Sequence, residues 1–566
     1  MASIIRKKVK NYTYYYYVES KRVDGRPTLV NQKCLGTAES IAQKMSVTST
    51  MPEPLYSIVL DFADISLLFD LATRLNVVET INNHSQKRNQ GISIGNYILL
   101  AAINRAVAPT SKSEIAHWYS KTVLSRLLPI ETKHLTSQNY WNHMCLTDED
   151  ISKIEDDLVK NIVYTYKLDT SHLIYDATNF FTYINTKQDS VLAKRGHSKE
   201  KRNDLRIVGL SMMLSPDCNI PLLYDTYPGN TPDSKQFAVM LDKLKHRYEK
   251  LINKSADVTI IFDRGNNAQY NIDQLENENF PLYYVGGLKK NQCADLFDID
   301  KSKYTQLSGE CFEKVTAYRT TKNAYERDMT VVVTFNQNLY DGQMQGILLN
   351  IEKTYENLSA IQRQLINRAE GIVIKGRTPT SASVEKQVKA ALKLEYMEDI
   401  FDYELTTLNG VPFVKFILNE TKLAHLQKTM LGKTVLFTNR HEWSTEQIVA
   451  SYRSAWHIEH AFSQMKDIDH LTVRPFFHWT DQKIKIHIFY CVLAYRLCCL
   501  LKKELLVHDI DESINKILEH LNELKYIITV LGTSKSDILC SFSQSNNLAE
   551  KIAAHYNLKE KYLPVS

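Results

Sequence analysis

The sequence predicts an α/β protein with a mixed sheet at its centre, a small β unit at its N-terminus and helical regions towards both ends. Three observations lead to this prediction. Apolar runs typical of strands alternate with helical patterns over residues 169–290. Apolar residues recur at helical spacing over residues 51–168, and the last segment, residues 501–566, continues in helices. Strand patterns recur through residues 291–432. Such alternation is typical of α/β folds.

The composition is that of a globular protein. Of the 566 residues, 44% are hydrophobic and 23% are charged, which excludes wholesale disorder, a collagen-like repeat and a disulfide-dense scaffold. The nine cysteines form no CxxC pair and no zinc-like spacing with histidine. Because the N-terminus lacks the apolar core of a secretory signal, we expect reduced thiols in a cytoplasmic, nucleoid-associated protein.

One apolar stretch, residues 488–501, resembles part of a membrane span. It is too short to cross a bilayer and Arg496 interrupts it, so we interpret it as a buried core helix and expect no membrane association.

Residues 1–50 are predicted to form a basic β unit. Strand patterns occupy residues 14–18 and 29–35, and the net charge of residues 1–33 is +6. A solvated basic arm and an arm that contacts nucleic-acid phosphates both explain this charge. The sequence leaves the two interpretations open.

Two aspartates are predicted at the ends of strands over residues 169–290. The first strand ends in Asp176, two hairpin strands and a helix follow, and the fourth strand ends in Asp263. An aspartate at such a position is usually a helix cap or a turn former. Two of them at the ends of apolar strands also suit a metal site.

A capped helix follows the strand-rich region. The capping box Ser444-Thr-Glu-Gln447 predicts a helix that runs to about Met465. Tyr452, Glu459 and Lys466 are seven residues apart on it, so they share one face and Trp456 lies close to that face. An ordinary amphipathic helix with solvated charges is the alternative. Together with Asp176 and Asp263, Glu459 completes the carboxylate set that paired Mg²⁺ ions require.

Five ordered motifs carry a family resemblance: LIYDAT, GHSKEKRNDL, PLLYDTYPGNTPD, IIFDRG and YRSAWHIEHAFSQMK. Together they resemble the DDE transposases of prokaryotic insertion sequences, in the branch with a β-strand insertion domain and a Tyr-Arg-Glu-Lys signature. The resemblance implies a ribonuclease-H-like catalytic domain formed by residues 169–290 and 433–500. A β-rich insertion domain, residues 291–432, interrupts it.

The resemblance also implies roles for individual residues. Asp176, Asp263 and Glu459 would hold two Mg²⁺ ions, for which Mn²⁺ would be able to substitute. Tyr452 and Lys466 occupy the signature's phosphate-contacting positions, whereas the signature's arginine position is Ala455, and Arg474 is a candidate to replace it. Further predicted DNA contacts, several of them in the basic segment 194–206 of net charge +4, are His197, Lys199, Lys201, Arg202, Arg264, Arg453 and Trp456.

The function implied is cut-and-paste transposition. Such an enzyme binds the terminal inverted repeats of its element, cleaves at the ends with metal-activated water, and joins the 3′-hydroxyl ends to target DNA. Residues 51–168 are the candidate end-binding region, and residues 501–566 are the candidate dimerisation region for a homodimeric synaptic complex on double-stranded DNA. Two alternatives stay open: a metal-dependent nuclease without strand transfer, and a catalytically inactive DNA-binding regulator.

Overall fold

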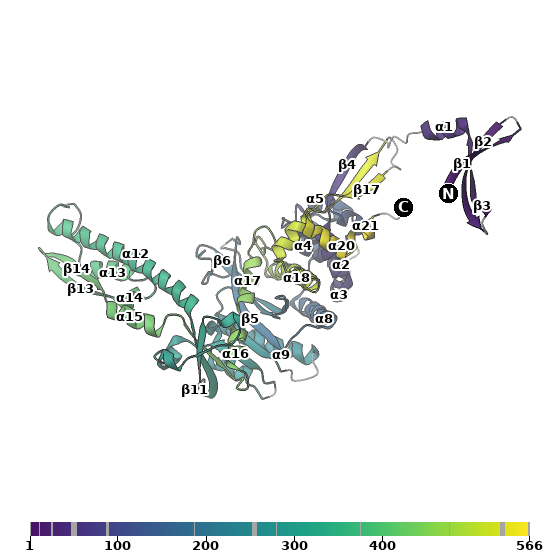
Figure 1. The fold of residues 1–566 in the computed structure, drawn as a ribbon. Helices are drawn as coiled ribbons and strands as arrows, with labels where there is room; N and C mark the ends of the chain where they lie inside the picture. Colours follow the sequence, from purple (N-terminus) through teal and green to yellow (C-terminus); the bar gives the residue numbers. More distant parts are fainter. Residues whose placement is uncertain are drawn as a thin grey trace. The chain divides into compact units, whose positions relative to one another are not determined.

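The computed structural model divides the chain into two compact units (Figure 1). One unit comprises Met1–Ala63, Lys121–Val123 and His520–Ser566, and the other comprises Asp64–Ser120 and Leu124–Glu519. The structure describes residues 2–10, 12–23, 26–46, 54–86, 90–185, 187–251, 257–278, 280–373, 375–474, 476–532 and 538–563. The expected boundary between residues 50 and 51 lies outside these ranges.

A nine-stranded mixed sheet forms the centre of the larger unit. Its strand order is β10-β11-β12-β15-β9-β8-β5-β6-β7. The strands β5, β8 and β9 run parallel, and every other neighbouring pair is antiparallel. The bounds are β5 His172–Thr182, β6 Arg206–Leu214, β7 Pro221–Pro228, β8 Thr259–Phe262, β9 Tyr283–Gly287, β10 Thr305–Gln306, β11 Val315–Ala324, β12 Arg327–Asn336 and β15 Lys433–Thr438.

The central strands are buried, as their apolar runs predict. All four residues of β8 are buried, and aromatic rings join the sheet to helix α9, Asp233–Leu251. The Phe237 ring of α9 lies 4.5 Å from the Tyr175 ring of β5 and 4.8 Å from the Phe262 ring of β8. Phe237 therefore packs against both β5 and β8, which pair with each other in parallel.

Asp176 does not end its strand, contrary to the prediction. The parallel pairing of β5 with β8 stops at Tyr175 and Phe262, but β5 continues to Thr182 because β6 pairs with it along that length. Asp263 does follow the last residue of β8. Both aspartates therefore come directly after the last parallel pair and lie at the same level of the sheet.

The predicted single helix after the sheet is two helices, α16 Thr445–Arg453 and α17 Trp456–Gln464. The capping box of Ser444 and Gln447 is present as predicted. Between the helices, the amides of Ala455 and His457 donate to carbonyls three residues earlier, which is the pattern of a 3₁₀ turn. Such a turn winds more tightly than an α-helix. The helix face that Tyr452, Glu459 and Lys466 were predicted to share is therefore interrupted at this turn.

Residues 337–432 are chiefly helical, which corrects the β-rich expectation for residues 291–432. Strands β10 to β12 of this region belong to the nine-stranded sheet. The rest consists of the 33-residue helix α12 Gln337–Ala369 packed beside the hairpin of β13 Phe401–Leu408 and β14 Val411–Leu418 (Figure 1), with helices α13 Ser381–Ala391, α14 Met397–Ile400 and α15 Glu420–Thr429. The sequence pattern does indicate helices near residues 347–368 and 383–394 and a hairpin over residues 403–418, and these three elements are present, but the helices outweigh the strands.

Helices form the rest of the larger unit. They are α2 Ala63–Arg74, α3 Val77–Asn83, α4 Ile94–Val107, α5 Ile115–Ser120, α6 Leu124–Leu127, α7 Ser137–His143, α8 Asp148–Tyr166, α10 Gln269–Leu275, α11 Ala294–Phe297, α18 Asp481–Leu506 and α19 Ile514–Asn522. Helix α18 packs against α4 and α8. With 26 residues it is long and apolar enough to cross a membrane by length and composition, but 94% of its apolar window is buried inside the protein.

The charge that Arg496 of α18 brings into the core is compensated by an ion pair. Its guanidinium is fully buried and donates to both carboxylate oxygens of Glu155, at 3.1 and 2.7 Å. The predicted buried core helix is thus confirmed, with a buried ion pair that compensates the charge.

The smaller unit contains two three-stranded sheets. One consists of β1 Ala2–Val9, β2 Tyr12–Val23 and β3 Arg26–Thr37, followed by α1 Ala38–Ser46. The other pairs β4 Pro54–Asp61 with β16 Lys525–Leu531 and β17 Ile538–Phe542, and the chain ends in α20 Asn547–His555 and α21 Leu558–Tyr562. The C-terminal region was expected to be helical throughout. It is not, because β16 and β17 form a sheet with β4.

Candidate active site

Asp176 and Asp263 form the centre of the site. The pKa of Asp176 is raised to about 6, chiefly by burial and in part by the carboxylates of Asp263 and Asp233, although the Lys199 ammonium and the Ala177 amide act to lower it. Asp233 is the first residue of α9 and lies 3.7 Å from the Lys199 ammonium. Three carboxylates thus share one region, and the charges of Asp263 and Asp233 disfavour the charge of Asp176.

Tyr452 joins the α16 helix to this region. Its hydroxyl donates to a carboxylate oxygen of Asp263 at 3.1 Å. Burial raises the pKa of Tyr452, and the charges of Asp263 and Glu459 add to this effect. Gly287, the last residue of β9, makes room for the ring, since a Cβ at this position would lie 2.7 Å from the Tyr452 hydroxyl.

Glu459 approaches the site from α17, which packs against β5. Its carboxylate is exposed and acts electrostatically on Tyr452. Within the described ranges, however, no three His, Cys, Asp or Glu side chains lie close enough together to hold a metal ion. The donor chemistry nevertheless suits a divalent cation, because all the candidate ligands are carboxylates.

A cluster of cationic side chains lies on the same face of β5. Side chains two apart share a face of a strand, so Asp176, Thr178 and Phe180 point the same way. The Lys466 ammonium donates to the Thr178 hydroxyl at 2.9 Å and lies 5.6 Å from the Phe180 ring. Lys466 therefore lies over the face of β5 that carries Asp176.

Arg474 belongs to the same cluster. Its guanidinium donates to the Lys466 carbonyl at 2.5 Å and to a Glu200 oxygen at 2.6 Å, and Glu200 also lies 3.7 Å from the Lys466 ammonium. Burial lowers the pKa of Lys466, and the cations Lys199 and Arg474 lower it further. Ala455 lies in the 3₁₀ turn between α16 and α17, so Arg474 is the arginine that the structure brings to Lys466.

The predicted basic segment is only partly directed at the site. The Lys199 ammonium donates to the Ala177 carbonyl of β5. Arg202 pairs with Asp204 at 2.8 Å and stacks on Phe181. His197 and Lys201 are exposed.

The remaining predicted contacts fall into two groups. Arg264 is exposed and acts on Tyr452, and Trp456 is 56% exposed with its ring stacked on His457. Arg453, by contrast, donates to the Cys311 carbonyl at 2.8 Å. The structure thus gives Arg453 a contact within the protein.

Three residues with a part in the geometry were missed from the sequence. Asp233 and Glu200 lie within motifs that were recognised, but their charges were read as part of a turn and of a basic loop. Gly287 carries no chemical signal of its own. Its role is visible only once β9 and α16 are placed together.

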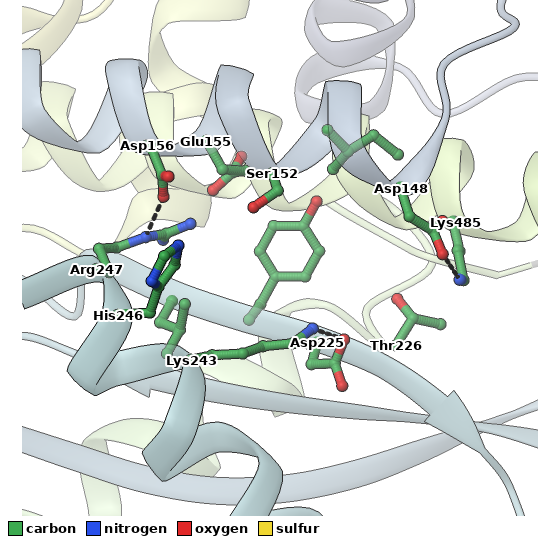
Figure 2. A pocket seen from close by; sticks show the side chains of 13 residues that line it. Asp148, Ser152, Glu155, Asp156, Asp225, Thr226, Lys243, His246, Arg247 and Lys485 are labelled. Carbon is green, nitrogen blue, oxygen red and sulfur yellow. Dashed lines mark hydrogen bonds and ion pairs between the residues drawn. The ribbon is translucent and has the colours of Figure 1, made fainter. Parts of the chain in front are cut away.

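A cavity of about 210 Å³ elsewhere in this unit has a different character (Figure 2). Its charged groups are paired with one another: Asp156 with Arg247 at 2.8 Å, and Asp225 with Lys243, as Figure 2 shows. None of the candidate catalytic carboxylates lines it. We interpret these ion pairs as interactions that stabilise the packing of α8, β7 and α9.

The comparisons with known proteins identify the class of protein. Residues 167–497 match the transposase DDE domain, which is more than half of the 566 residues, so the chain belongs to that family. It is a transposase with a DDE motif, as the five sequence motifs predict.

Two further comparisons complete the picture. No curated protein matches the chain's sequence. Among solved structures, a piggyBac transposase synaptic complex with hairpin DNA is similar, with 9% identity, a TM-score of 0.39, and coverage of 81% of this chain and 80% of that chain. A likeness at this level adds nothing to the family assignment.

Proposed function

We propose that the chain is a cut-and-paste DNA transposase whose catalytic carboxylates are Asp176, Asp263 and Glu459. The observation that supports this most directly is the junction of β5, β8 and α16, where Tyr452 binds Asp263 beside Asp176. The substrate is the double-stranded DNA of the element's terminal inverted repeats and of the target. The insertion-sequence origin belongs to this proposal, as does a homodimer that holds the two ends.

The part of the sheet formed by β5 to β9 is proposed to be the ribonuclease-H-like core that the family resemblance implies. Its support is the parallel β5-β8 pair that brings two aspartates to one level, and the packing of α17 against β5. Residues 291–432 then separate the strands that carry the aspartates from the helix that carries the glutamate.

Two divalent ions, Mg²⁺ or Mn²⁺, would supply a nucleophilic water and stabilise the leaving 3′-oxygen when bound. Asp176 and Asp263 would hold them from the sheet, and Glu459 from α17. The raised pKa of Asp176 fits this role, because a buried carboxylate surrounded by like charges gains most from a cation.

The chain's own cations would position the DNA. Lys466 and Lys199 place ammonium groups on the Asp176 face and edge of β5, and Arg474 anchors Lys466 through its carbonyl. Tyr452, which donates to Asp263, would hold that carboxylate in orientation and contact a phosphate beside it. Positively charged donors close to the scissile phosphate stabilise charge that develops there in the transition state.

The test compares cleavage with binding on a labelled duplex that carries the element's own terminal repeat. Asp263→Ala should abolish Mg²⁺-dependent nicking and leave the dissociation constant for the duplex within about twofold. Loss of both activities at the same folded fraction would remove Asp263 from the proposed catalytic set.

The two alternatives are separated by the same reaction. A nuclease would nick the duplex and form no joint between the freed 3′-end and a target plasmid. An inactive regulator would bind without nicking in either metal.

A further inference from the structure

The basic segment, residues 194–206, contains two acidic residues, Glu200 and Asp204. Asp204 pairs with Arg202 of the same segment at 2.8 Å. Glu200 instead contacts residues far from it in the chain, and the proposed chemistry gives it no part. Its side chain is only 20% exposed, so the fold holds this carboxylate in a defined place.

Hydrogen bonds to β5 fix the backbone beside Glu200. The side-chain nitrogen of Asn179 donates to the His197 carbonyl at 3.0 Å, and its side-chain oxygen accepts from the Lys199 backbone N–H at 3.1 Å. The Lys199 ammonium donates to the Ala177 carbonyl of the same strand. Glu200 therefore follows directly on a stretch of chain that is attached to β5.

A close approach of two glycines fixes the other side of the basic segment. A Cβ on Gly196 would lie 2.3 Å from the Gly229 carbonyl oxygen, and a Cβ on Gly229 would lie 2.0 Å from the Ile207 carbonyl oxygen of β6. Both glycines belong to motifs of the family resemblance, GHSKEKRNDL and PLLYDTYPGNTPD. A larger residue at either position would push the basic segment away from β6 and from the turn after β7.

Glu200 contacts two cations of the candidate active site. The Arg474 guanidinium donates to one of its carboxylate oxygens at 2.6 Å, and the Lys466 ammonium lies 3.7 Å from the other. The side chains of Glu200, Lys466 and Arg474 are 20%, 21% and 23% exposed. Because all three are largely shielded from water, their charges interact more strongly than those of a fully exposed surface pair.

A carboxylate in this position uses the donors that a DNA phosphate would need. Guanidinium groups bind carboxylates and phosphates through the same N–H donors. The Lys466 ammonium also holds the Thr178 hydroxyl at 2.9 Å, on the face of β5 that carries Asp176. A phosphate brought to this face meets a carboxylate of like charge, and the two groups compete for the same cations.

We infer that Glu200 is an internal competitor of DNA: it occupies Lys466 and Arg474 in the free chain, and a phosphate of the bound duplex displaces it. The inference rests on the proposed function, which assigns Lys466 to the DNA. Glu200 then sets the affinity for DNA and takes no part in the chemical step. It also compensates two partly buried cations while no DNA is bound.

A positioning role is the alternative. Glu200 would then hold Lys466 and Arg474 in the orientation in which they bind DNA, and its removal would weaken binding. The two roles therefore predict changes of opposite sign in DNA affinity when the carboxylate is removed.

The test measures the dissociation constant of the full chain for a labelled duplex that carries the element's terminal repeat, by fluorescence anisotropy in EDTA so that no cleavage occurs. Glu200→Gln keeps the size of the side chain and removes its charge. Two unit charges about 4 Å apart interact strongly enough, even in water, to change a binding constant about fivefold. Glu200→Gln should therefore bind the duplex at least about fivefold more tightly than wild type.

Three further variants make the test specific. Glu385→Gln causes the same change of net charge at a surface pair of α13, where Glu385 lies 2.8 Å from Lys389, and should stay within about twofold of wild type. Arg474→Met removes one of the two cations, so Glu200→Gln should tighten binding less in that background than in wild type. Glu200→Ala should show the same gain as Glu200→Gln and replaces it if that variant unfolds.

An affinity of folded Glu200→Gln equal to or below that of wild type would overturn the inference, as would an equal gain in Glu385→Gln. A gain from Glu200→Gln that is undiminished in Arg474→Met would also overturn it. Lys466→Met separates these results from a failure of the proposed function, because this variant should bind the duplex more weakly than wild type. If Lys466→Met binds as wild type does, the assignment of Lys466 to DNA fails and the inference fails with it. If Lys466→Met binds more weakly and Glu200→Gln shows no gain, the inference alone fails.

Discussion

At the scale of single residues, the site depends on how Tyr452 is held between Gly287 and Asp263. The hydroxyl that binds Asp263 is the atom closest to the position where Gly287 lacks a Cβ. The ring reaches the carboxylate because β9 carries no side chain there. A tyrosine of the predicted signature is thus linked to a glycine that no motif singles out.

Removal of the Tyr452 hydroxyl should reduce cleavage without unfolding the chain. A hydrogen bond to a charged group contributes about 1.5–3 kcal/mol, so Tyr452→Phe should lower the nicking rate by a factor of about 10 to 100. Single-turnover nicking of the end duplex measures this. A rate equal to that of wild type would show that the bond to Asp263 has no part in the reaction.

Gly287→Ala should produce a similar loss by displacing the same ring. The new Cβ would meet the hydroxyl at 2.7 Å, and overpacking of this kind costs about 1 kcal/mol or more of stability. Gly346→Ala in α12 is the control, because no atom lies within 4 Å of a Cβ there. The nicking rate and the urea midpoint of each variant test the prediction, which fails if both variants behave alike.

Burial lowers the pKa of Lys112, and this predicts a dependence of stability on pH. The unfolded chain holds this proton up to its ordinary pKa of 10.5, whereas the folded chain releases it at about 7. The unfolded state therefore binds more protons between these values, and the free energy of unfolding should rise with pH across that window.

Lys112→Met removes this contribution. The difference in unfolding free energy between wild type and Lys112→Met, measured by urea denaturation at several pH values from 6 to 10, should change in favour of wild type as the pH rises above 7. A difference that stays constant with pH would contradict the lowered pKa.

Much of the candidate site follows from the sequence, because strand-end carboxylates and motif order are local patterns. Asp263 directly follows β8, as the strand pattern predicts, while Tyr452 binds Asp263 and Lys466 binds Thr178. The donation of Arg453 to Cys311 could not be foreseen, since it depends on a segment about 140 residues earlier in the chain. Long-range partners of this kind leave no trace in local spacing.

At the scale of elements, helix α18 is apolar enough to cross a membrane by composition, yet it lies in the core of the larger unit. Its buried Arg496 is compensated by Glu155 of α8 and by the Pro221 carbonyl at 2.9 Å. The charge that interrupts the apolar run therefore joins α18 to α8 and to the start of β7.

Breaking this pair should destabilise the larger unit. Arg496→Met leaves Glu155 buried without its partner, which costs about 3–5 kcal/mol. The double variant Arg496→Met with Glu155→Gln should recover part of that loss. Chemical denaturation measures both, and a single variant as stable as wild type would rule out a structural role for the pair.

The division between α16 and α17 is an element that the sequence did not reveal. The capping box marks the start of α16, but the 3₁₀ turn at Ala455 has no proline or glycine to announce it. It separates Tyr452 from Glu459, so the two residues are carried by different helices.

At the scale of the whole molecule, the mixed sheet could be predicted and the extent of the insertion's helices could not. The alternation of apolar runs with short helical patterns predicted β5 to β9, because each of these elements is short and bounded by turns. Residues 337–432 mix helical and strand-like apolar spacing, and the 33 residues of α12 are fixed by packing against β14. The second sheet of the smaller unit pairs β4 with β16, segments more than 450 residues apart in the chain.

The account as a whole rests on three carboxylates that act together on DNA. The most direct measurement is strand cleavage and joining by the full chain on a labelled terminal-repeat duplex with Mg²⁺ or Mn²⁺, compared between wild type and Glu459→Gln. The account predicts nicking and joining by wild type in both metals, and neither reaction by Glu459→Gln despite unchanged binding of the duplex. Cleavage that persists in Glu459→Gln, or its absence from wild type that binds the duplex tightly, would contradict it.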